Sequence, residues 1–443
     1  MRDLAKHLRR MAMTAVAIGA VAAYAPAWAA GGAQNTAADT SGGLIHYNSN
    51  NRQFWLHPPA NWYMGDQTNA QKGEDVALTV GPATGISGAK LQANLKKIKL
   101  PPGFHISVYA DHVLSARQMA LGDKGTLFVG SFSLGVVYAV TDHNGRKEVK
   151  TILKGLKMPT GIAFRDGTLY VADIDRILAY PDAEDHLGDM PKPTVVYADM
   201  PPYLPHGWKY IAFDKQGWIY MAFGPPCNEC MPPTSNAQIR RINPKNGEAY
   251  IVALGVRNSV GGAVDPRTGD YWFSMNERDW LGDNSPQDTV SHISRLGENF
   301  GYPFCHNGNI PDPTYNLGID CSQFTPPTYL LGPHVAPLGM KFYTGSQFPA
   351  SYKDNIFLAE HGSWNRRDYL GGRIVRLIVS PDGSQVQQKV FATGWIQGTA
   401  TYLGRPSDVI VAKDGSLLVA DDYAGAIYQI SYNKGHDSAN ASK

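Results

Sequence analysis

The chain has 443 residues, of which 18% are charged and 43% hydrophobic, and its formal net charge is +2. These proportions are those of an ordinary globular protein that is long enough to bury a large core. A charge so close to neutral implies no general electrostatic attraction to nucleic acid or to anionic lipid, which argues against function classes that depend on such attraction.

The first 29 residues have the pattern of a secretory signal. Arg2, Lys6, Arg9 and Arg10 precede a short apolar stretch, which ends in the small-x-small sequence at 27–29. This order predicts cleavage after Ala29 and a periplasmic or secreted protein. A retained membrane anchor is the alternative, but the apolar stretch is short for a membrane span. Cleavage would change the formal charge from +2 to about −1.

Residues 30–94 are rich in Gly, Asn, Ser and Thr, with scattered aromatic residues. We interpret them as an N-terminal extension that is partly irregular and partly packed on the domain that follows. One domain is predicted over residues 95–435, because the repeats described next fill that range. Residues 436–443 are predicted to be a disordered tail.

Six copies of one strand–turn–strand pattern occupy that domain, at 118–131, 161–173, 210–223, 262–274, 339–360 and 408–432. In DVIVAKDGSLLVAD, alternating apolar residues stand on both sides of an Asp-Gly turn, where Gly accepts a positive φ. One hairpin cannot bury its apolar face alone, so copies must stack. Turn glycines 125, 167, 217 and 269 recur at the length of a propeller blade. The sequence therefore predicts an all-β fold, a six-bladed β-propeller.

Four cysteines follow the signal: Cys227, Cys230, Cys305 and Cys321. An even number in an exported chain favours disulfides, most simply 227–230 and 305–321. A redox CxxC motif or half of a zinc site are the alternatives for the first pair. Prolines surround that pair, whereas a redox motif needs a helix to begin after its first cysteine, so a structural disulfide is the better interpretation.

Three blades carry chemically useful residues just before their first strands, where propellers form the mouth of the central channel. These residues are His206, the pair Arg257-Asn258, and Arg405, with Asp408 shortly after it. Histidine can accept a proton near neutral pH, and arginine can hold a carboxylate through two parallel hydrogen bonds. Each alone has a plain structural explanation, such as a turn histidine or an ordinary ion pair. Their repeated location favours a functional site.

An acidic stretch, SMNERDWLGDNSPQD, follows the second strand of the fourth repeat at 274–288. It contains Glu277, Asp279, Asp283 and Asp288, and oxygen ligands of this kind suit a hard cation such as calcium. The spacing is not that of an EF-hand, so the ligands cannot be assigned from the acids. A solvated acidic loop is the equal alternative.

Several long motifs, among them HGWKYIAFD (206–214), GVRNSVGGAVDPRTGDYWFSMNERDWLGD (255–283), EHGSWNR (360–366) and GRPSDVIVAKDGSLLVADD (404–422), resemble the glucose/sorbosone dehydrogenases. The resemblance covers roughly residues 95–432 and is strongest to the sorbosone dehydrogenase branch. It implies a six-bladed propeller that uses pyrroloquinoline quinone (PQQ) and Ca²⁺.

The resemblance also implies site residues. His206 would take the hydroxyl proton of a sugar while a hydride passes to the quinone. Arg257 and Asn258 would contact cofactor and substrate, and Arg405 would hold the acidic cofactor, with Arg366 as a weaker candidate for the same role. Calcium would be held partly by the backbone carbonyls of Glu277 and Arg278. The chain has no haem motif, so a separate carrier is expected to accept the electrons.

Three positions depart from the glucose branch of the family. Val260 stands where that branch has Gln, Ser407 where it has a second Arg, and Pro225 where it has the acid that orients the catalytic histidine. The expected substrate is therefore a sugar or sugar aldehyde that need not be glucose. The alternatives are a calcium-dependent lactonase or esterase propeller, and a propeller that only binds. A lactonase needs acids at several blade starts, whereas the residues here suit an anionic cofactor.

Overall fold

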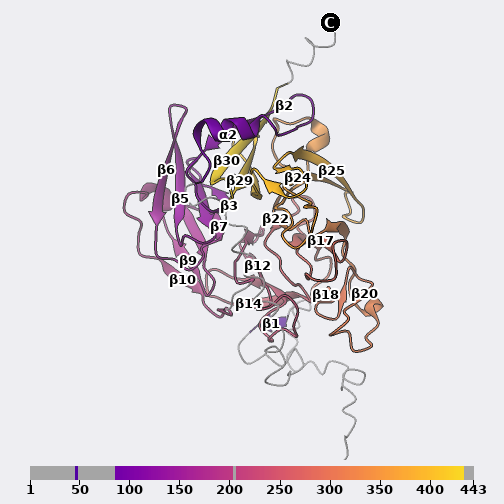
Figure 1. Ribbon diagram of the computed structural model, residues 1–443. Coiled ribbons are helices and arrows are strands. Elements are labelled where there is room, and N and C mark those ends of the chain that lie inside the picture. The colour runs from indigo at the N-terminus through magenta and orange to yellow at the C-terminus, as the bar shows by residue number, and fades with distance from the viewer. Residues whose placement is uncertain (1–44, 48–84, 203–205, 434–443) are drawn as a thin grey trace, which may run out of the picture.

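The computed structural model describes residues 45–47, 85–202 and 206–433. The expected signal sequence, most of the N-terminal extension and the expected tail lie outside these residues, so those three assignments stay predictions. Within the described part, six sheets surround a central axis (Figure 1), and each is built on four antiparallel strands. Two further short strands extend one of these sheets to six strands. The six-bladed β-propeller predicted from the repeats is confirmed.

The blades follow one another along the chain, and each begins with its innermost strand. The first three blades are β3 (Ala116–Leu121), β4 (Leu127–Ser131), β5 (Val137–His143), β6 (Arg146–Leu153); β7 (Gly161–Arg165), β8 (Thr168–Ala172), β9 (Ile177–Tyr180), β10 (Thr194–Tyr197); and β11 (Ile211–Phe213), β12 (Ile219–Phe223), β13 (Gln238–Ile242), β14 (Ala249–Leu254). The next two are β15 (Gly262–Val264), β16 (Tyr271–Met275), β17 (Gln287–His292), β21 (Tyr329–Pro333); and β22 (Pro337–Phe342), β23 (Ile356–Glu360), β24 (Arg373–Val379), β25 (Val386–Thr393).

The sixth blade joins the two ends of the domain. Its inner strands are β28 (Pro406–Val411), β29 (Leu417–Asp421) and β30 (Ala426–Tyr432), and its outer strand is β2 (Phe104–Ala110), which comes before the first blade in the chain. The register pairs Phe104 with Tyr432 and Ile106 with Ile430. This pairing closes the ring, because β3 of the first blade also contacts β28 of the sixth.

Smaller elements decorate the blades. The helix α2 (Gly88–Leu95) buries Leu91 and Leu95 in the core of the fifth and sixth blades, and β1 (Ile45–Tyr47) pairs with β14 at the outer edge of the third blade. The remaining elements are β18 (Glu298–Asn299), β19 (Cys305–His306), β20 (Ile310–Pro311), β26 (Ile396–Gln397), β27 (Thr401–Tyr402) and the 3₁₀ turns Ala183–Asp185, Cys321–Gln323 and Ala350–Tyr352. Among the described residues, no helix has the length and hydrophobicity needed to cross a membrane.

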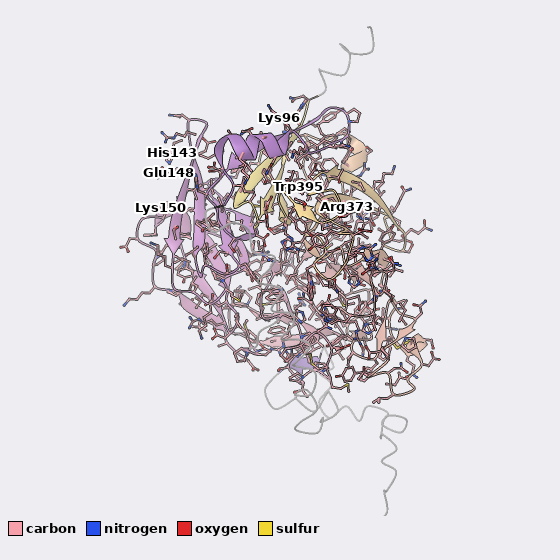
Figure 2. All side chains as sticks on the ribbon, in the orientation of Figure 1. Lys96, His143, Glu148, Lys150, Arg373 and Trp395 are labelled. Atoms are coloured by element: carbon pink, nitrogen blue, oxygen red, sulfur yellow. A yellow bond between two sulfur atoms is a disulfide. The ribbon has the colours of Figure 1, made fainter. Side chains whose placement is uncertain are left out.

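The hydrophobic core lies between neighbouring blades. Each inner and middle strand turns apolar residues toward the next blade, and Trp272 and Trp395 are among the largest side chains that are almost completely buried. Charged side chains gather on the outer side of the blades instead, as Glu148 and Lys150 do on β6 of the first blade and His143 does at the end of the neighbouring β5 (Figure 2). The turn glycines Gly125 and Gly217 have φ values of 101° and 88°, the conformation for which the repeats require glycine.

Both expected disulfides are present, Cys227–Cys230 and Cys305–Cys321. The first lies in the loop after β12, where the hydroxyl of Tyr302 accepts from the backbone N–H of Cys230 at 3.2 Å. The second closes the loop that contains β19 and β20, in the insertion between the fourth and fifth repeats.

Candidate functional site

One cavity opens where the blades' first strands begin and their second strands end. These points coincide because the two strands of each inner hairpin are antiparallel, so the start of one lies beside the end of the other. The polar residues that line the cavity from the starts of first strands are Arg117, His206, Arg257, Asn258, His334 and Arg405. Those that line it from the ends of second strands are Asn228, Asn276, Glu277, Asp279, His361 and Asn365.

His206 is held in a defined orientation at the cavity wall. Its Nδ1 lies 2.9 Å from the backbone carbonyl oxygen of Pro225. A carbonyl can only accept, so Nδ1 carries the hydrogen, and in the neutral ring Nε2 then carries the lone pair. Burial lowers the pKa of His206 well below its usual value, and the positive charge of Arg257 lowers it further. The ring is therefore neutral near pH 7 and can accept a proton through Nε2.

A glycine makes room for this histidine. A side chain at Gly224 would place its Cβ 2.6 Å from the Cβ of His206 and 3.1 Å from the carbonyl oxygen of Arg257. His206 itself has a φ of +59°, a conformation that side-chain-bearing residues adopt rarely. The tight fit and the unusual backbone together fix the imidazole where β12 ends.

Arg257 is buried and bound on all sides by backbone and amide oxygens. Its Nη1 donates to the carbonyls of Asn276 (2.9 Å) and Glu277 (2.7 Å), while Nε and Nη2 donate to the carbonyl and the side chain of Asn228 at 2.9 and 2.8 Å. Its Nη2 also lies 3.6 Å from a carboxylate oxygen of Asp279. The guanidinium therefore ties the loop after β12 to the loop after β16.

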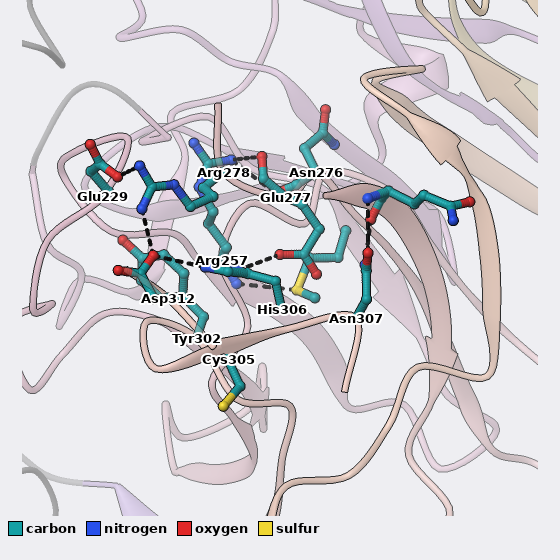
Figure 3. Close-up of polar contacts among 12 residues, drawn as sticks. Glu229, Arg257, Asn276, Glu277, Arg278, Tyr302, Cys305, His306, Asn307 and Asp312 are labelled. Carbon is teal, nitrogen blue, oxygen red and sulfur yellow. Dashed lines mark hydrogen bonds and ion pairs between the residues drawn. The ribbon is translucent and has the colours of Figure 1, made fainter. Parts of the chain in front are cut away.

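Behind this wall, alternating charges run through a buried network (Figure 3). Glu229 pairs with Arg278, Arg278 with Asp312 (2.5 Å), Asp312 with Nε2 of His306 (2.9 Å), and Nδ1 of His306 with Glu277 (3.0 Å). Burial disfavours the imidazolium of His306, but the two carboxylates outweigh it and raise the pKa of His306. The network fixes the backbone at residues 277–278, where the carbonyl of Glu277 accepts a hydrogen bond from Arg257.

The opposite wall comes from the first, fifth and sixth blades and contains a second charged cluster. Asp422 lies 2.8 Å from Arg117 and 2.8 Å from Nε2 of His361. Burial opposes ionisation of Asp422, yet His361 and Arg117 hold its pKa below its usual value. Burial and the nearby Arg405 lower the pKa of His361 to about 4. Arg405 donates to the backbone carbonyls of residues 361 and 362 at 3.2 and 2.6 Å.

The predicted site residues fall into two groups. His206, Arg257, Asn258, Arg405 and Glu277 all line the cavity. The following two do not: the side chain of Arg278 belongs to the buried network, and the guanidinium of Arg366 donates to the Asp283 carbonyl and, at 3.0 Å, to Asn284. The structure thus brings together the catalytic and main cofactor candidates and places Arg366 on a neighbouring loop.

The positions that depart from the glucose branch each have a local role here. The carbonyl of Pro225 accepts the hydrogen bond from His206, Val260 is buried, and the hydroxyl of Ser407 donates to the carbonyl of Ala116 at 2.7 Å. Asp408 does not pair with Arg405; it accepts from the N–H of Met119, and burial raises its pKa to about 7.

Among the arginines and histidines that line the cavity, three were not predicted as site residues: Arg117, His334 and His361. The first two stand at the starts of β3 and β22, the same position that pointed to His206 and Arg405, so applying that rule to all six repeats would have found them. His361 directly follows β23, the second strand of its blade, and residues at the ends of second strands also face the cavity. Arg117 is notable because its Nε is buried and has no hydrogen-bond partner among the described residues.

The carboxylates of the acidic stretch do not form a metal cage. No group of three or more His, Cys, Asp or Glu side chains among the described residues could hold a metal ion. Asp288 accepts from the backbone N–H groups of Glu277 and Ala336 at 2.9 and 2.8 Å, and burial raises its pKa to about 8. The Glu277 side chain is bound to His306. The carboxylates of Asp288 and Glu277 therefore already have partners within the protein.

Comparison with known proteins places this arrangement in a family. The pattern of the Glucose / Sorbosone dehydrogenase family matches residues 228–429, and a TrAA12-like pattern matches residues 98–316. An uncharacterized protein of Borreliella burgdorferi is 34% identical over 350 residues, which cover 76% of this chain and 91% of that protein.

Two further matches concern one fungal enzyme. A pyrroloquinoline quinone-dependent pyranose dehydrogenase of Coprinopsis cinerea is 47% identical over 185 residues, which cover 32% of this chain but only 24% of that enzyme. The solved holo form of the pyranose dehydrogenase PQQ domain from the same organism aligns with a TM-score of 0.65 at 20% identity, over 75% of this chain and 97% of that domain. The chain therefore belongs to the glucose/sorbosone dehydrogenase family of six-bladed propeller oxidoreductases.

Proposed function

We propose that this protein is a PQQ-dependent dehydrogenase that oxidises a sugar or sugar aldehyde, with His206 as the general base. The observation that carries the proposal is the neutral His206, whose Nδ1–H is held by Pro225, in a cavity that three arginines also line. The sugar dehydrogenase activity of the family and of the Coprinopsis enzyme supports the same reaction class. Within the family, the sorbosone branch stays a prediction.

The residues present fit an anionic, planar cofactor. PQQ carries three carboxylates on a flat ring system, and the cavity offers Arg117, Arg257 and Arg405 together with aromatic side chains of Phe132 and Trp208. Arg117 Nε is buried without a partner among the described residues, and a buried unpaired donor is costly. A carboxylate of the bound cofactor would satisfy that donor.

The chain's own residues supply binding and proton transfer. When bound, the quinone provides the hydride acceptor. His206 Nε2 takes the proton of the substrate hydroxyl, while the hydrogen bond from Nδ1 to Pro225 keeps the lone pair aimed into the cavity. Arg257 places a fixed positive charge beside this base and keeps it neutral before substrate arrives. Asn258 lines the same wall and can orient a hydroxyl group.

The proposal includes a calcium ion, but not one held by a cage of carboxylates. Because the carboxylates near Glu277 are bound elsewhere, a Ca²⁺ ion would rely on backbone carbonyls of Glu277 and Arg278 and on oxygens of the cofactor itself. The Glu277 carbonyl already accepts from Arg257 at 2.7 Å, so the ion would have to share that oxygen. We therefore propose that calcium binds with the quinone and not before it.

Metal removal tests this point. We expect chelation to abolish PQQ-dependent activity and added Ca²⁺ to restore it, with Mg²⁺ much less effective because Mg²⁺ demands a regular octahedral shell. Dye reduction with a panel of sugars measures activity, and circular dichroism should report an intact fold throughout. Full activity in protein shown by elemental analysis to lack calcium would remove the ion from the proposal.

The cofactor clamp is tested by a pair of variants. Arg405→Ala should weaken PQQ binding by about 1.5–3 kcal/mol, the contribution of a charge-assisted hydrogen bond. Arg366→Ala is the matched control, since that guanidinium does not line the cavity. Titration of the apoprotein with PQQ, followed by absorbance, measures both. Equal losses in the two variants, or a loss only in Arg366→Ala, would contradict the assignment of the clamp to Arg405.

We further propose that the protein works in an oxidising compartment and passes its electrons to a separate carrier. The two disulfides support the first statement, since such bonds persist mainly outside the cytosol. The expected signal sequence at residues 1–29 agrees with it.

A further inference from the structure

Two tryptophans stand at the rim of the cavity. Trp280 follows β16 and Trp364 follows β23, and their rings meet edge to face with centroids 5.3 Å apart. Trp364 lines the cavity, whereas Trp280 does not and is 46% exposed. A tryptophan is among the most favourable side chains to bury, so an aromatic surface left open at the mouth of a binding cavity calls for an occupant.

The loop that carries Trp280 is fixed to its surroundings on both sides of the ring. Before it, Asp279 accepts from Nδ2 of Asn365 at 2.7 Å, and its own backbone N–H donates to Asn228 at 2.8 Å. After it, the carbonyl of Gly282 accepts from Nε2 of His334 at 2.8 Å. The exposed ring is thus presented by an anchored backbone, in which Trp280 itself has a φ of +69°. A side-chain-bearing residue held in this conformation is a reason to look for a function.

The groups around the two rings are those that bind a sugar. A pyranose has an apolar face of C–H groups, which packs on an aromatic ring, and an edge of hydroxyls, which need hydrogen-bond acceptors and donors. Asp279 and Asn365 stand next to Trp280 and Trp364 in the chain and line the cavity. Asn365 Oδ1 is buried and has no hydrogen-bond partner among the described residues, so it can accept from a hydroxyl group.

We propose that Trp280 and Trp364 form a subsite for a second sugar ring, so that the preferred substrates are oligosaccharides or glycosides. The inference rests on the proposed sugar dehydrogenase function. Its geometric basis is that Trp364 lines the cavity shared with His206 while Trp280 lies one ring further out. A sugar that reacts at His206 would fill the cavity, and a ring linked to it would pack on the exposed face of Trp280.

The subsite is tested first by binding, which needs no activity. Calorimetric titration of the purified full-length protein with glucose, maltose, maltotriose, cellobiose and cellotriose should show tighter binding for the di- or trisaccharides of at least one series. Trp280→Ala should remove this gain, about tenfold in Kd, and Trp280→Phe should keep most of it. Trp218→Ala is the control, because Trp218 lies in the β11–β12 turn at the far end of those strands. Absence of any gain with chain length in the wild-type protein overturns the subsite.

Kinetics then separate the subsite from the proposed reaction. With PQQ and calcium added, Trp280→Ala should lower kcat/KM for the longer sugars about tenfold and leave glucose unchanged. A protein that binds oligosaccharides through Trp280 but shows no PQQ-dependent oxidation would refute the reaction and keep the subsite. An equal loss for all sugars, or a change only in the KM of the electron-accepting dye, would show that Trp280 serves another purpose and would overturn the proposal.

Discussion

The substitution His206→Gln is expected to lower turnover about 100-fold or more while leaving PQQ affinity nearly unchanged. Glutamine can still donate a hydrogen bond toward the Pro225 carbonyl, but it has no group that accepts a proton near neutral pH. The loss should therefore appear in kcat and kcat/KM together, because the missing proton acceptor acts only as the reaction proceeds. Steady-state dye reduction and a PQQ titration measure the two properties separately.

The same base predicts a pH dependence. His206 acts only when unprotonated, and burial beside Arg257 lowers its pKa below 6.5. At pH 6.5 most molecules should therefore be active, and kcat/KM should fall only as pH drops further, through the lowered pKa. His206→Gln should lose this acid limb. His105→Gln is the control and should keep it, because the side chain of His105 is exposed on the outer strand β2. Near wild-type turnover in His206→Gln would exclude this histidine as the base.

Arg257→Met is expected to cause the largest loss of stability among the site variants, about 3–5 kcal/mol in the free energy of unfolding. The side chain is only 2% exposed, and its removal leaves the carboxylate of Asp279 without its nearest cation and frees four acceptors on Asn228, Asn276 and Glu277. Buried acceptors without donors are costly. Urea unfolding followed by fluorescence measures the effect.

A double-mutant cycle separates the two causes. Asp279→Asn removes the carboxylate charge, so the double variant with Arg257→Met should recover part of the loss if the unpaired charge matters. Full additivity would assign the whole loss to the carbonyl and amide acceptors. Arg366→Met provides a matched arginine on an adjacent loop and should change stability little, because Arg366 is partly exposed. A loss for Arg257→Met no greater than for this control would contradict the structural role of Arg257.

The repeats could be predicted because their signals are local. An Asp-Gly turn such as that at Gly415 and the alternation of apolar residues on both sides are read within a dozen residues, and the resulting hairpins agree with β28 and β29. The outer strands share no common pattern: most residues of β6 alternate between exposed and half-buried, whereas every residue of β14 is buried. The pairing of β2 with β30 joins segments more than 300 residues apart, and no local pattern could indicate it.

The site was predictable where position in the repeat decides the role, and not where side-chain contacts do. His206, Arg257 and Arg405 follow from their places before inner strands. The orientation of His206 by a carbonyl was not predictable, because any residue at Pro225 supplies that oxygen. Arg366 was expected near the cofactor, but the acceptors on residues 283 and 284 draw its guanidinium to the neighbouring loop.

The shared sixth blade has a consequence for how the protein is made. During synthesis, β2 leaves the ribosome first among the propeller strands but has no partner until β30 follows at the other end of the domain. Until then it presents an unpaired edge, on which other chains can add, and the ring cannot close. A chain that crosses a membrane unfolded and completes its synthesis before folding avoids this waiting period. Any partner that covers residues 104–110 in the meantime would therefore govern how much of the protein reaches its closed form.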